Sequence, residues 1–188
     1  MTGATGASLE QTVESFQRAV FEQRPVGPEH YSEEYFSSDW REGDNRYDVD
    51  TRRKIEARNP ELIKEVFAPQ KVLDLGCGPG FLMFFLHEIG VDVEGIDFSP
   101  ESVELAPEPI RDRITIGPVT EPIAPEQGYD LVVCREVFEH LTVLQVRRAV
   151  GELCRASSRF VYVTTRFHPA PATLLDFTTQ FDVDPSHI

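Results

Sequence analysis

The stretch VLDLGCGPGF, residues 72–81, constrains the fold of this chain more than any other part of the sequence. An apolar run that holds one acid leads there into glycines at alternate positions, Gly76, Gly78 and Gly80. The apolar run predicts a buried strand, and the apolar residues after the glycines predict a helix. Glycine lets the backbone approach a ligand closely, and a helix N-terminus presents free N–H groups. The stretch therefore predicts a nucleotide-like ligand at a strand–turn–helix unit.

Strands and helices alternate along the rest of the chain. Strands are predicted at 71–75, 91–97, 113–117, 129–134 and 159–165, and helices at 9–23, 51–58, 60–67, 81–89, 100–105 and 142–155. This order predicts an α/β fold, Rossmann-like, with a mostly parallel sheet and helices on both faces. Ligands of such sheets bind beyond the carboxyl ends of the strands.

The length of 188 residues suits one domain with a full core and is short for two. We divide it into an N-terminal helical segment, residues 1–58, which serves as a lid, and a ligand-binding core, residues 59–188. An aromatic group in the first part has two interpretations. It is either a lid over the ligand or a packing patch for the N-terminal helix, and its members are Tyr31, Tyr35, Phe36 and Trp40.

The spacing of the glycines excludes two common nucleotide-binding motifs. The dinucleotide fingerprint G-x-G-x-x-G would place its third glycine at Phe81, so it does not fit. A Walker loop requires Gly-Lys-Ser/Thr, and no lysine lies near these glycines. The loop therefore needs another ligand class.

The motif that fits is D-x-G-x-G-x-G. VLDLGCGPG resembles motif I of the class I S-adenosylmethionine-dependent methyltransferases, and the resemblance extends from about residue 60 to residue 166. It implies that Asp74 orients the loop and the methionine amino group, and that the glycines form the floor under the methionine and ribose. Asp97 resembles the acid that accepts hydrogen bonds from both ribose hydroxyls. The implied cofactor residues are Asp74, Gly76, Cys77, Gly78, Gly80, Asp97, Phe98 and Val119.

Phe98 is expected to border the adenine. The loop Gly117-Pro118-Val119 lacks the acid that the family often has there, which leaves backbone contacts at Val119. Two alternatives need no ligand: the glycines form a tight turn, and Asp97 accompanies Ser99 at a helix N-cap. Acids at the ends of two adjacent strands argue against both.

The segment CREVFEHL, residues 134–141, follows the fourth predicted strand. If it turns helically, Glu136, Glu139 and His140 fall at i, i+3 and i+4 on one face at the carboxyl edge of the sheet. Two carboxylates and an imidazole can act there as metal ligands or as an acid/base cluster.

The E-x-x-E-H pattern is similar to that of the ubiquinone-pathway O-methyltransferases and of the small-RNA 3′-terminal 2′-O-methyltransferases. The resemblance implies divalent metal binding at these positions, with a further histidine downstream of strand five in the RNA enzymes, for which we prefer His187 over His168. Carboxylate-rich ligation with a histidine suits Mg²⁺ or Mn²⁺. The implied metal ligands are Glu136, Glu139, His140 and His187, and the implied catalytic residues are His140, Glu139 and His187. Without a metal, His140 is a general base or a hydrogen-bonding partner of the loop.

The net charge of −14 repels a polyanion at long range. The densest basic run, Arg52 to Lys54, is interpreted as a solvated helix face. We therefore expect S-adenosylmethionine-dependent O-methylation of a small-molecule or saccharide hydroxyl, assisted by a divalent metal. A small-RNA 2′-O-methyltransferase and a non-catalytic methyltransferase-like binding subunit are the alternatives.

The part of the chain after residue 166 is short compared with the family that the chain resembles. The family sheet has seven strands, and about twenty residues follow residue 166 here, so some C-terminal strands are expected to be missing. The N-terminal segment or a second subunit, in a homodimer, would cover the sheet edge. Three cysteines without metal spacing indicate reduced thiols and a cytoplasmic location, and no membrane insertion is expected.

Overall fold

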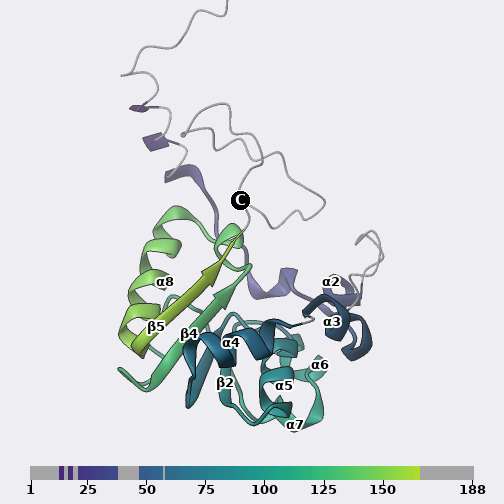
Figure 1. The fold of residues 1–188 in the computed structure, drawn as a ribbon. Coiled ribbons are helices and arrows are strands. Elements are labelled where there is room, and N and C mark those ends of the chain that lie inside the picture. Colours follow the sequence, from purple (N-terminus) through teal and green to yellow (C-terminus); the bar gives the residue numbers. More distant parts are fainter. Residues whose placement is uncertain (1–12, 15–16, 19–20, 38–46, 57, 166–188) are drawn as a thin grey trace, which may run out of the picture.

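A five-stranded parallel sheet forms the centre of the molecule (Figure 1). The structure is a computed structural model, and it describes residues 13–14, 17–18, 21–37, 47–56 and 58–165. The strands lie in the order β3-β2-β1-β4-β5. Their bounds are β1 Lys71–Leu75, β2 Asp92–Asp97, β3 Ile114–Ile116, β4 Tyr129–Arg135 and β5 Ser157–Thr164. The Rossmann-like α/β fold predicted from the sequence is confirmed.

Helices lie on both faces of the sheet. Those before and between the strands are α2 Glu33–Ser37, α3 Val49–Glu56, α4 Asn59–Phe67, α5 Phe81–Glu88, α6 Pro100–Leu105, α7 Glu108–Arg111 and α8 Val143–Ala156. Two 3₁₀ turns, η1 Pro28–His30 and η2 Phe138–His140, complete the set. Figure 1 shows α4 and α5 on one face and α8 on the other. The predicted helix at 9–23 lies largely outside the described residues.

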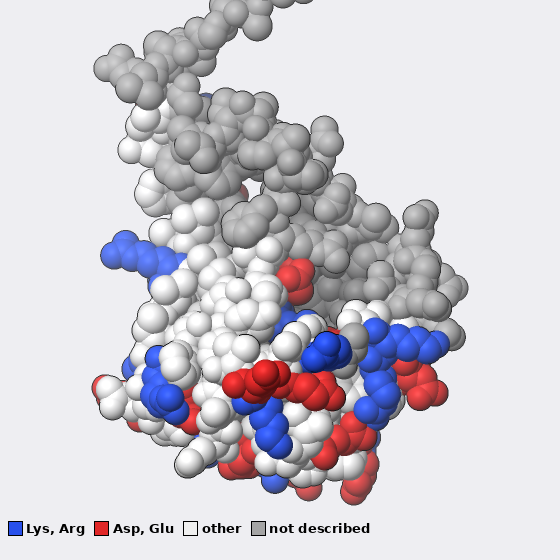
Figure 2. Space-filling model, in the orientation of Figure 1, with Lys and Arg blue, Asp and Glu red and all other residues white. Residues whose placement is uncertain are grey.

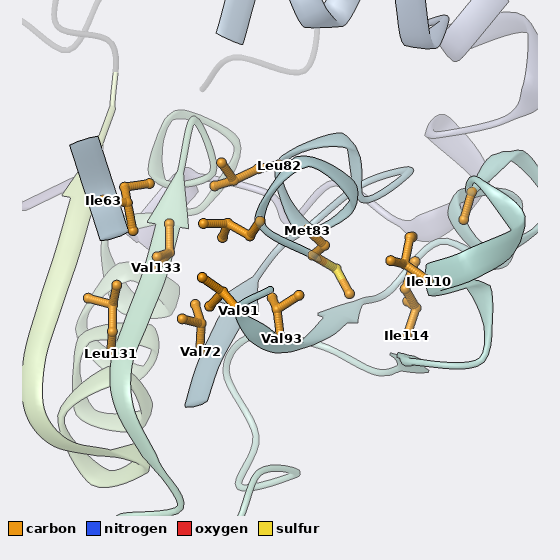
Figure 3. Close-up of a cluster of buried hydrophobic side chains, with 12 residues drawn as sticks. Ile63, Val72, Leu82, Met83, Val91, Val93, Ile110, Ile114, Leu131 and Val133 are labelled. Carbon is orange, nitrogen blue, oxygen red and sulfur yellow. The ribbon is translucent and has the colours of Figure 1, made fainter. Parts of the chain in front are cut away.

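Two apolar cores fill the spaces between the sheet and its helices. Successive residues of a strand point to opposite faces, so Val72 and Leu73 of β1 enter different cores. The first core lies under α4 and α5, and Figure 3 shows Leu82 and Met83 of α5 above the strand side chains. The second lies under α8, with Leu153 in it. Burial on both faces explains why the strands read as continuous apolar runs.

Two local features differ from the sequence-based expectation. Helix α7, a single turn that buries Ile110, was not predicted, because four residues with a proline in the first turn give no helical periodicity. Strand β5 begins at Ser157, directly after α8 ends at Ala156, and its register with β4 shifts near Tyr129. The predicted start at residue 159 was therefore two residues late.

Strand β5 is the edge of the sheet within the described part of the chain. Its side chains Phe160, Val161 and Val163 are each more than a third exposed, and an uncharged area covers this part of the surface in Figure 2. The segment 177–184, predicted to give at most one short strand, lies outside the described residues. Among the helices that the structure describes, none is long and apolar enough to cross a membrane.

Candidate functional site

The glycine loop connects β1 to α5, and each of its three glycines has a positive φ. A Cβ atom at Gly76 would lie 2.5 Å from Cγ2 of Val137, and one at Gly80 would lie 2.7 Å from Cδ1 of Ile110. At Gly78 a Cβ would meet no atom within 4 Å. A side chain at position 76 or 80 would therefore displace neighbouring side chains, whereas one at position 78 would meet none.

The loop is tied to the end of β2 by backbone hydrogen bonds. The N–H groups of Gly76 and Cys77 both donate to the carbonyl oxygen of Ile96, at 2.7 and 3.2 Å. The N–H of Gly78 donates to Oδ2 of Asp97 at 2.8 Å. The N–H of Ser99 donates to Oδ1 of the same carboxylate at 3.0 Å. The end of β2 therefore fixes the conformation of the loop.

Asp97 is buried at the carboxyl end of β2. Burial raises the pKa of its carboxyl group, while the hydrogen bonds from Ser99 and Gly78 lower it. Each oxygen accepts one backbone N–H, and a carboxylate has about four acceptor positions, so capacity for ligand hydroxyls remains. The two interpretations of Asp97, ribose acceptor and companion of Ser99, are compatible in this geometry.

Asp74 is buried at the end of β1, beside Asp97. Burial raises the pKa of its carboxyl group to about 7; Arg135 opposes this rise, whereas Glu56 and Asp97 add to it. A buried carboxylate in such a place favours a cationic partner. A ligand ammonium group would supply that partner.

Three other predicted cofactor residues lie around the loop with different orientations. The Sγ atom of Cys77 points toward Gly95 in β2, and burial raises the pKa of this thiol well above its usual range. Val119 is buried in the core under α8, so only its backbone can meet a ligand. Phe98 follows Asp97 and packs edge-on against Tyr31, with ring centroids 5.2 Å apart.

An aromatic cluster of Tyr31, Tyr35 and Phe36 covers the carboxyl edge of the sheet. Tyr31 reaches both sides of the site, because its ring also packs edge-on against His140, with centroids 5.8 Å apart. The Oγ of Ser99 donates to the carbonyl oxygen of Tyr31 at 2.8 Å. The cluster packs against Val26, Tyr47 and Phe98, and its role as a lid or as a packing patch for the N-terminal helix stays a prediction. Trp40 lies outside the described residues.

The segment after β4 does not form the predicted helical face. Glu136 has a φ of 54°, in the left-handed region, and only Phe138–His140 turn, as the 3₁₀ helix η2. The i, i+3, i+4 arrangement was wrong because the Glu136 N–H donates to the Thr164 carbonyl oxygen, which extends the pairing of β4 with β5.

Two carboxylates nevertheless meet there. Glu136 accepts from Oγ1 of Thr164 at 3.0 Å, and Oε2 of Glu139 accepts from Oγ1 of Thr165 at 2.8 Å. The other oxygen of Glu139, Oε1, is buried and has no hydrogen-bond partner among the described residues. Burial raises the pKa of Glu139, and the neighbouring Glu136 raises it further.

This carboxylate pair fits a cation or a shared proton. In the part of the chain that the structure describes, no group of three His, Cys, Asp or Glu side chains could hold a metal ion. His168 and His187 lie outside that part. The residues present therefore supply an incomplete ligand set, and the metal site at Glu136, Glu139, His140 and His187 stays a prediction.

Two residues at this edge were missed by the sequence analysis. Arg135, the last residue of β4, forms an ion pair with Glu56, the last residue of α3, with 2.8 Å between Nη1 and Oε2. The available signal was an arginine directly after the apolar run Leu131 to Cys134 in the strand YDLVVCR. The basic run also differs from its interpretation in part, because Arg52 is half-buried over the Tyr47 ring while Arg53 is exposed.

The sheet order and the glycine loop define an α/β protein of the doubly wound type. The buried acids Asp74 and Asp97 lie near the carboxyl edge of its sheet, where ligands of such sheets bind. Comparison with known proteins identifies the class. Residues 72–159 match the family described as "Methyltransferase domain". Residues 72–159 therefore form a methyltransferase domain of the class I S-adenosylmethionine-dependent type, as the resemblance of the motif implied.

Three proteins illustrate the similarity. The O-antigen chain terminator bifunctional methyltransferase/kinase WbdD of Escherichia coli is 32% identical over 146 residues, which cover 73% of this chain and 20% of that protein. The ubiquinone biosynthesis O-methyltransferase of Bordetella avium is 35% identical over 102 residues, 47% of this chain and 42% of that enzyme. A SAM-dependent methyltransferase structure from Archaeoglobus fulgidus shares the fold, with a TM-score of 0.58 and 20% identity over 72% of this chain and 61% of that one. The chain thus spans less than half the length of these two curated relatives.

Proposed function

We propose that this chain transfers a methyl group from S-adenosylmethionine to a hydroxyl oxygen of a small-molecule or saccharide acceptor. The observation that carries the proposal is the joint position of two features at one sheet edge. A glycine loop is clamped to Asp97, and a buried carboxylate oxygen of Glu139 has no described partner. The first suits a nucleoside cofactor, and the second suits removal of a proton beside it.

The cofactor residues have distinct tasks in this proposal. Asp74 receives the methionine ammonium, and Asp97 accepts from the ribose hydroxyls through its remaining acceptor positions. Gly78 leaves room for the ligand against its backbone, and Phe98 borders the adenine. S-adenosylmethionine, when bound, supplies an electrophilic methyl group on a sulfonium centre.

Glu139 is proposed as the general base. A hydroxyl is a weak nucleophile near neutral pH, so its proton has to leave as the oxygen attacks. The oxygen lone pair forms the new bond to the methyl carbon, the bond between that carbon and sulfur breaks with its electrons going to sulfur, and the proton moves to the Glu139 carboxylate. A raised pKa makes this carboxylate a stronger base than an ordinary glutamate. His140 lies one residue further on and is the second candidate base.

Assistance by Mg²⁺ or Mn²⁺ remains part of the proposal as a separate expectation. Such an ion, held by Glu136 and Glu139 together with His140 and His187, would lower the pKa of the acceptor hydroxyl. The proton transfer to Glu139 does not require it. Loss of turnover on chelation, with recovery on adding back Mg²⁺ or Mn²⁺, would support the ion; unchanged turnover would contradict it.

The acceptor class follows from charge and from the relatives. The chain carries a net charge of −14, and on the face in Figure 2 the Lys and Arg side chains are interspersed with Asp and Glu rather than gathered in a patch. A polyanionic acceptor would be repelled. The Bordetella relative is an O-methyltransferase by name. A neutral hydroxyl acceptor agrees with both.

The test is a methyl-transfer assay with labelled S-adenosylmethionine and a panel of phenolic, saccharide and short RNA acceptors. We expect transfer to a phenol or saccharide, and Glu139→Gln and His140→Ala should reduce turnover at least about tenfold while cofactor binding persists. Glu108→Gln, on the exposed surface of α7, is the control and should leave turnover unchanged. Full turnover in both site variants, or transfer to RNA alone, would contradict the proposal.

A further inference from the structure

Asp74 and Arg135 lie on the same face of the sheet at its carboxyl edge. Asp74 of β1 is opposite Val133 of β4, and Arg135 follows Val133 by two residues. Side chains two residues apart on a strand point to one face, here the face that carries α4 and α5. The positive charge of Arg135 accordingly opposes the rise in the pKa of Asp74 that burial causes.

Arg135 already has a carboxylate partner from the N-terminal segment. Its Nη1 and Nη2 atoms donate to Oε2 and Oε1 of Glu56 at 2.8 and 3.4 Å. The Glu56 side chain is 9% exposed and that of Arg135 22% exposed, so water screens the pair weakly. Asn59 also donates to Oε2 of Glu56, at 3.2 Å. Glu56 is therefore held in place by two partners.

When the Asp74 carboxyl group is ionised, these three residues carry two negative charges and one positive charge. Because the Arg135 guanidinium pairs with Glu56, the ionised Asp74 carboxylate can bind a second cationic group. Asp74 is the other carboxylate that acts electrostatically on Arg135, so without Glu56 the guanidinium would compete with any cationic ligand group for Asp74. An ammonium group at Asp74 completes a balanced set of two carboxylates and two cations.

We propose that Glu56 is a positioning residue for the cofactor: by pairing with Arg135, it reserves Asp74 for the methionine ammonium of S-adenosylmethionine. This inference rests on the proposed function, in which Asp74 receives that group. It makes helix α3, which lies outside the residues matched by the methyltransferase family, part of the cofactor site.

The experiment compares two ligands by calorimetry. S-adenosylhomocysteine carries the amino-acid ammonium, whereas 5′-methylthioadenosine has the same nucleoside and sulfur but no amino acid. Glu56→Gln should weaken S-adenosylhomocysteine binding by roughly tenfold to a hundredfold, as expected for a lost charged hydrogen bond, and change 5′-methylthioadenosine binding less than about threefold. A purely structural role would weaken both ligands alike.

Two variants control the result. Glu88→Gln breaks the exposed bidentate pair between Arg53 of α3 and Glu88 of α5, at 2.7 and 2.9 Å, so it tests helix docking without touching Asp74. It should leave both affinities unchanged. The double variant Glu56→Gln/Arg135→Met removes both members of the buried pair, which folded proteins tolerate better than removal of one. It should regain most of the lost S-adenosylhomocysteine affinity.

The outcomes separate this inference from the proposed function. If the wild-type chain binds neither ligand, the proposed function fails. If it binds both and Glu56→Gln binds S-adenosylhomocysteine as well as the wild type, or more tightly, Glu56 does not reserve Asp74 and Arg135 is free to meet the ligand carboxylate. A double variant that binds S-adenosylhomocysteine at least about tenfold more weakly than the wild type would also overturn the inference, and this comparison can be made when the single variant does not fold.

Discussion

The backbone N–H of Gly78 donates a 2.8 Å hydrogen bond to the carboxylate of Asp97, nineteen residues further along the chain. This bond joins the turn after β1 to the end of β2. A loop held in its binding conformation loses less conformational freedom when a ligand arrives. We therefore expect the cofactor to meet a preformed loop.

Gly78→Ala should weaken cofactor binding, while it lowers the unfolding free energy no more than Gly90→Ala does. Gly78 and Gly90 both have positive φ values, 52° and 77°, and a Cβ at either meets nothing within 4 Å. Both alanine variants should therefore lose a similar unfolding free energy, about 1–2 kcal/mol. Only Gly78 faces the proposed ligand. Calorimetry with S-adenosylhomocysteine should show weaker binding in Gly78→Ala alone; equal affinities in the two variants would argue against a ligand at this glycine.

Asp97→Asn should impair both the loop and the cofactor site. The amide group presents a donor where the carboxylate accepted from Gly78 or Ser99, and one unsatisfied buried N–H costs about 1–3 kcal/mol. Thermal unfolding and calorimetry measure the two effects. Asp92→Asn, at the exposed start of the same strand, removes only a surface ion pair with Arg113 and serves as the control. Matching losses of affinity in both variants would contradict the assigned role.

Asp74→Asn should stabilise the ligand-free protein at alkaline pH while it abolishes tight cofactor binding. The pKa of Asp74 is raised from 3.8 to about 7 in the folded chain. A raised pKa gives a stabilisation that is complete below pH 4 and disappears as the pH rises through 7.

The asparagine variant lacks this dependence, so its advantage in unfolding free energy over the wild type should grow between pH 4 and 8. The full difference is on the order of 2–4 kcal/mol. Denaturant unfolding at pH 5 and pH 8 measures it. A constant difference between the two proteins across this range would show that Asp74 titrates like an ordinary aspartate.

Glu136→Gly tests whether a strained residue is retained for its side chain. Glu136 and Gln127 both adopt left-handed backbone conformations, with φ values of 54° and 50°. Glycine relieves that strain but loses more entropy on folding. Glu136→Gly and its control Gln127→Gly should therefore each change the unfolding free energy by less than about 1 kcal/mol. Methyl-transfer rates should fall only in Glu136→Gly, because Gln127 lies away from the site. Unchanged turnover in both would leave the Glu136 carboxylate without a catalytic task.

The core of the fold could be predicted because its signals are local. The apolar run 72–75 and the glycines after it follow from backbone chemistry within ten residues, and the structure has the strand, turn and helix there. Alternation of strands with helices similarly predicted a parallel sheet. The end of β1 and the end of β2 meet because parallel neighbours share one carboxyl edge.

The site after β4 could not be predicted in the same way. Residues 134–141 have a helical spacing of acids and a histidine, but Glu136 is held by Thr164, which is 28 residues away on β5. The ion pair of Glu56 and Arg135 spans 79 residues and depends on where α3 docks. Such contacts are fixed by tertiary packing, which local periodicity does not record.

The N-terminal segment has a consequence for how the protein is made. Tyr31 and Glu56 leave the ribosome early, yet their partners Ser99 and Arg135 are added 68 and 79 residues later. At about 5–20 residues per second, Glu56 waits on the order of 4–16 s for its guanidinium. Helix α3 can meet α5 through Arg53 and Glu88 before then, but the ion pair of Glu56 with Arg135 forms only after β4 has been synthesised.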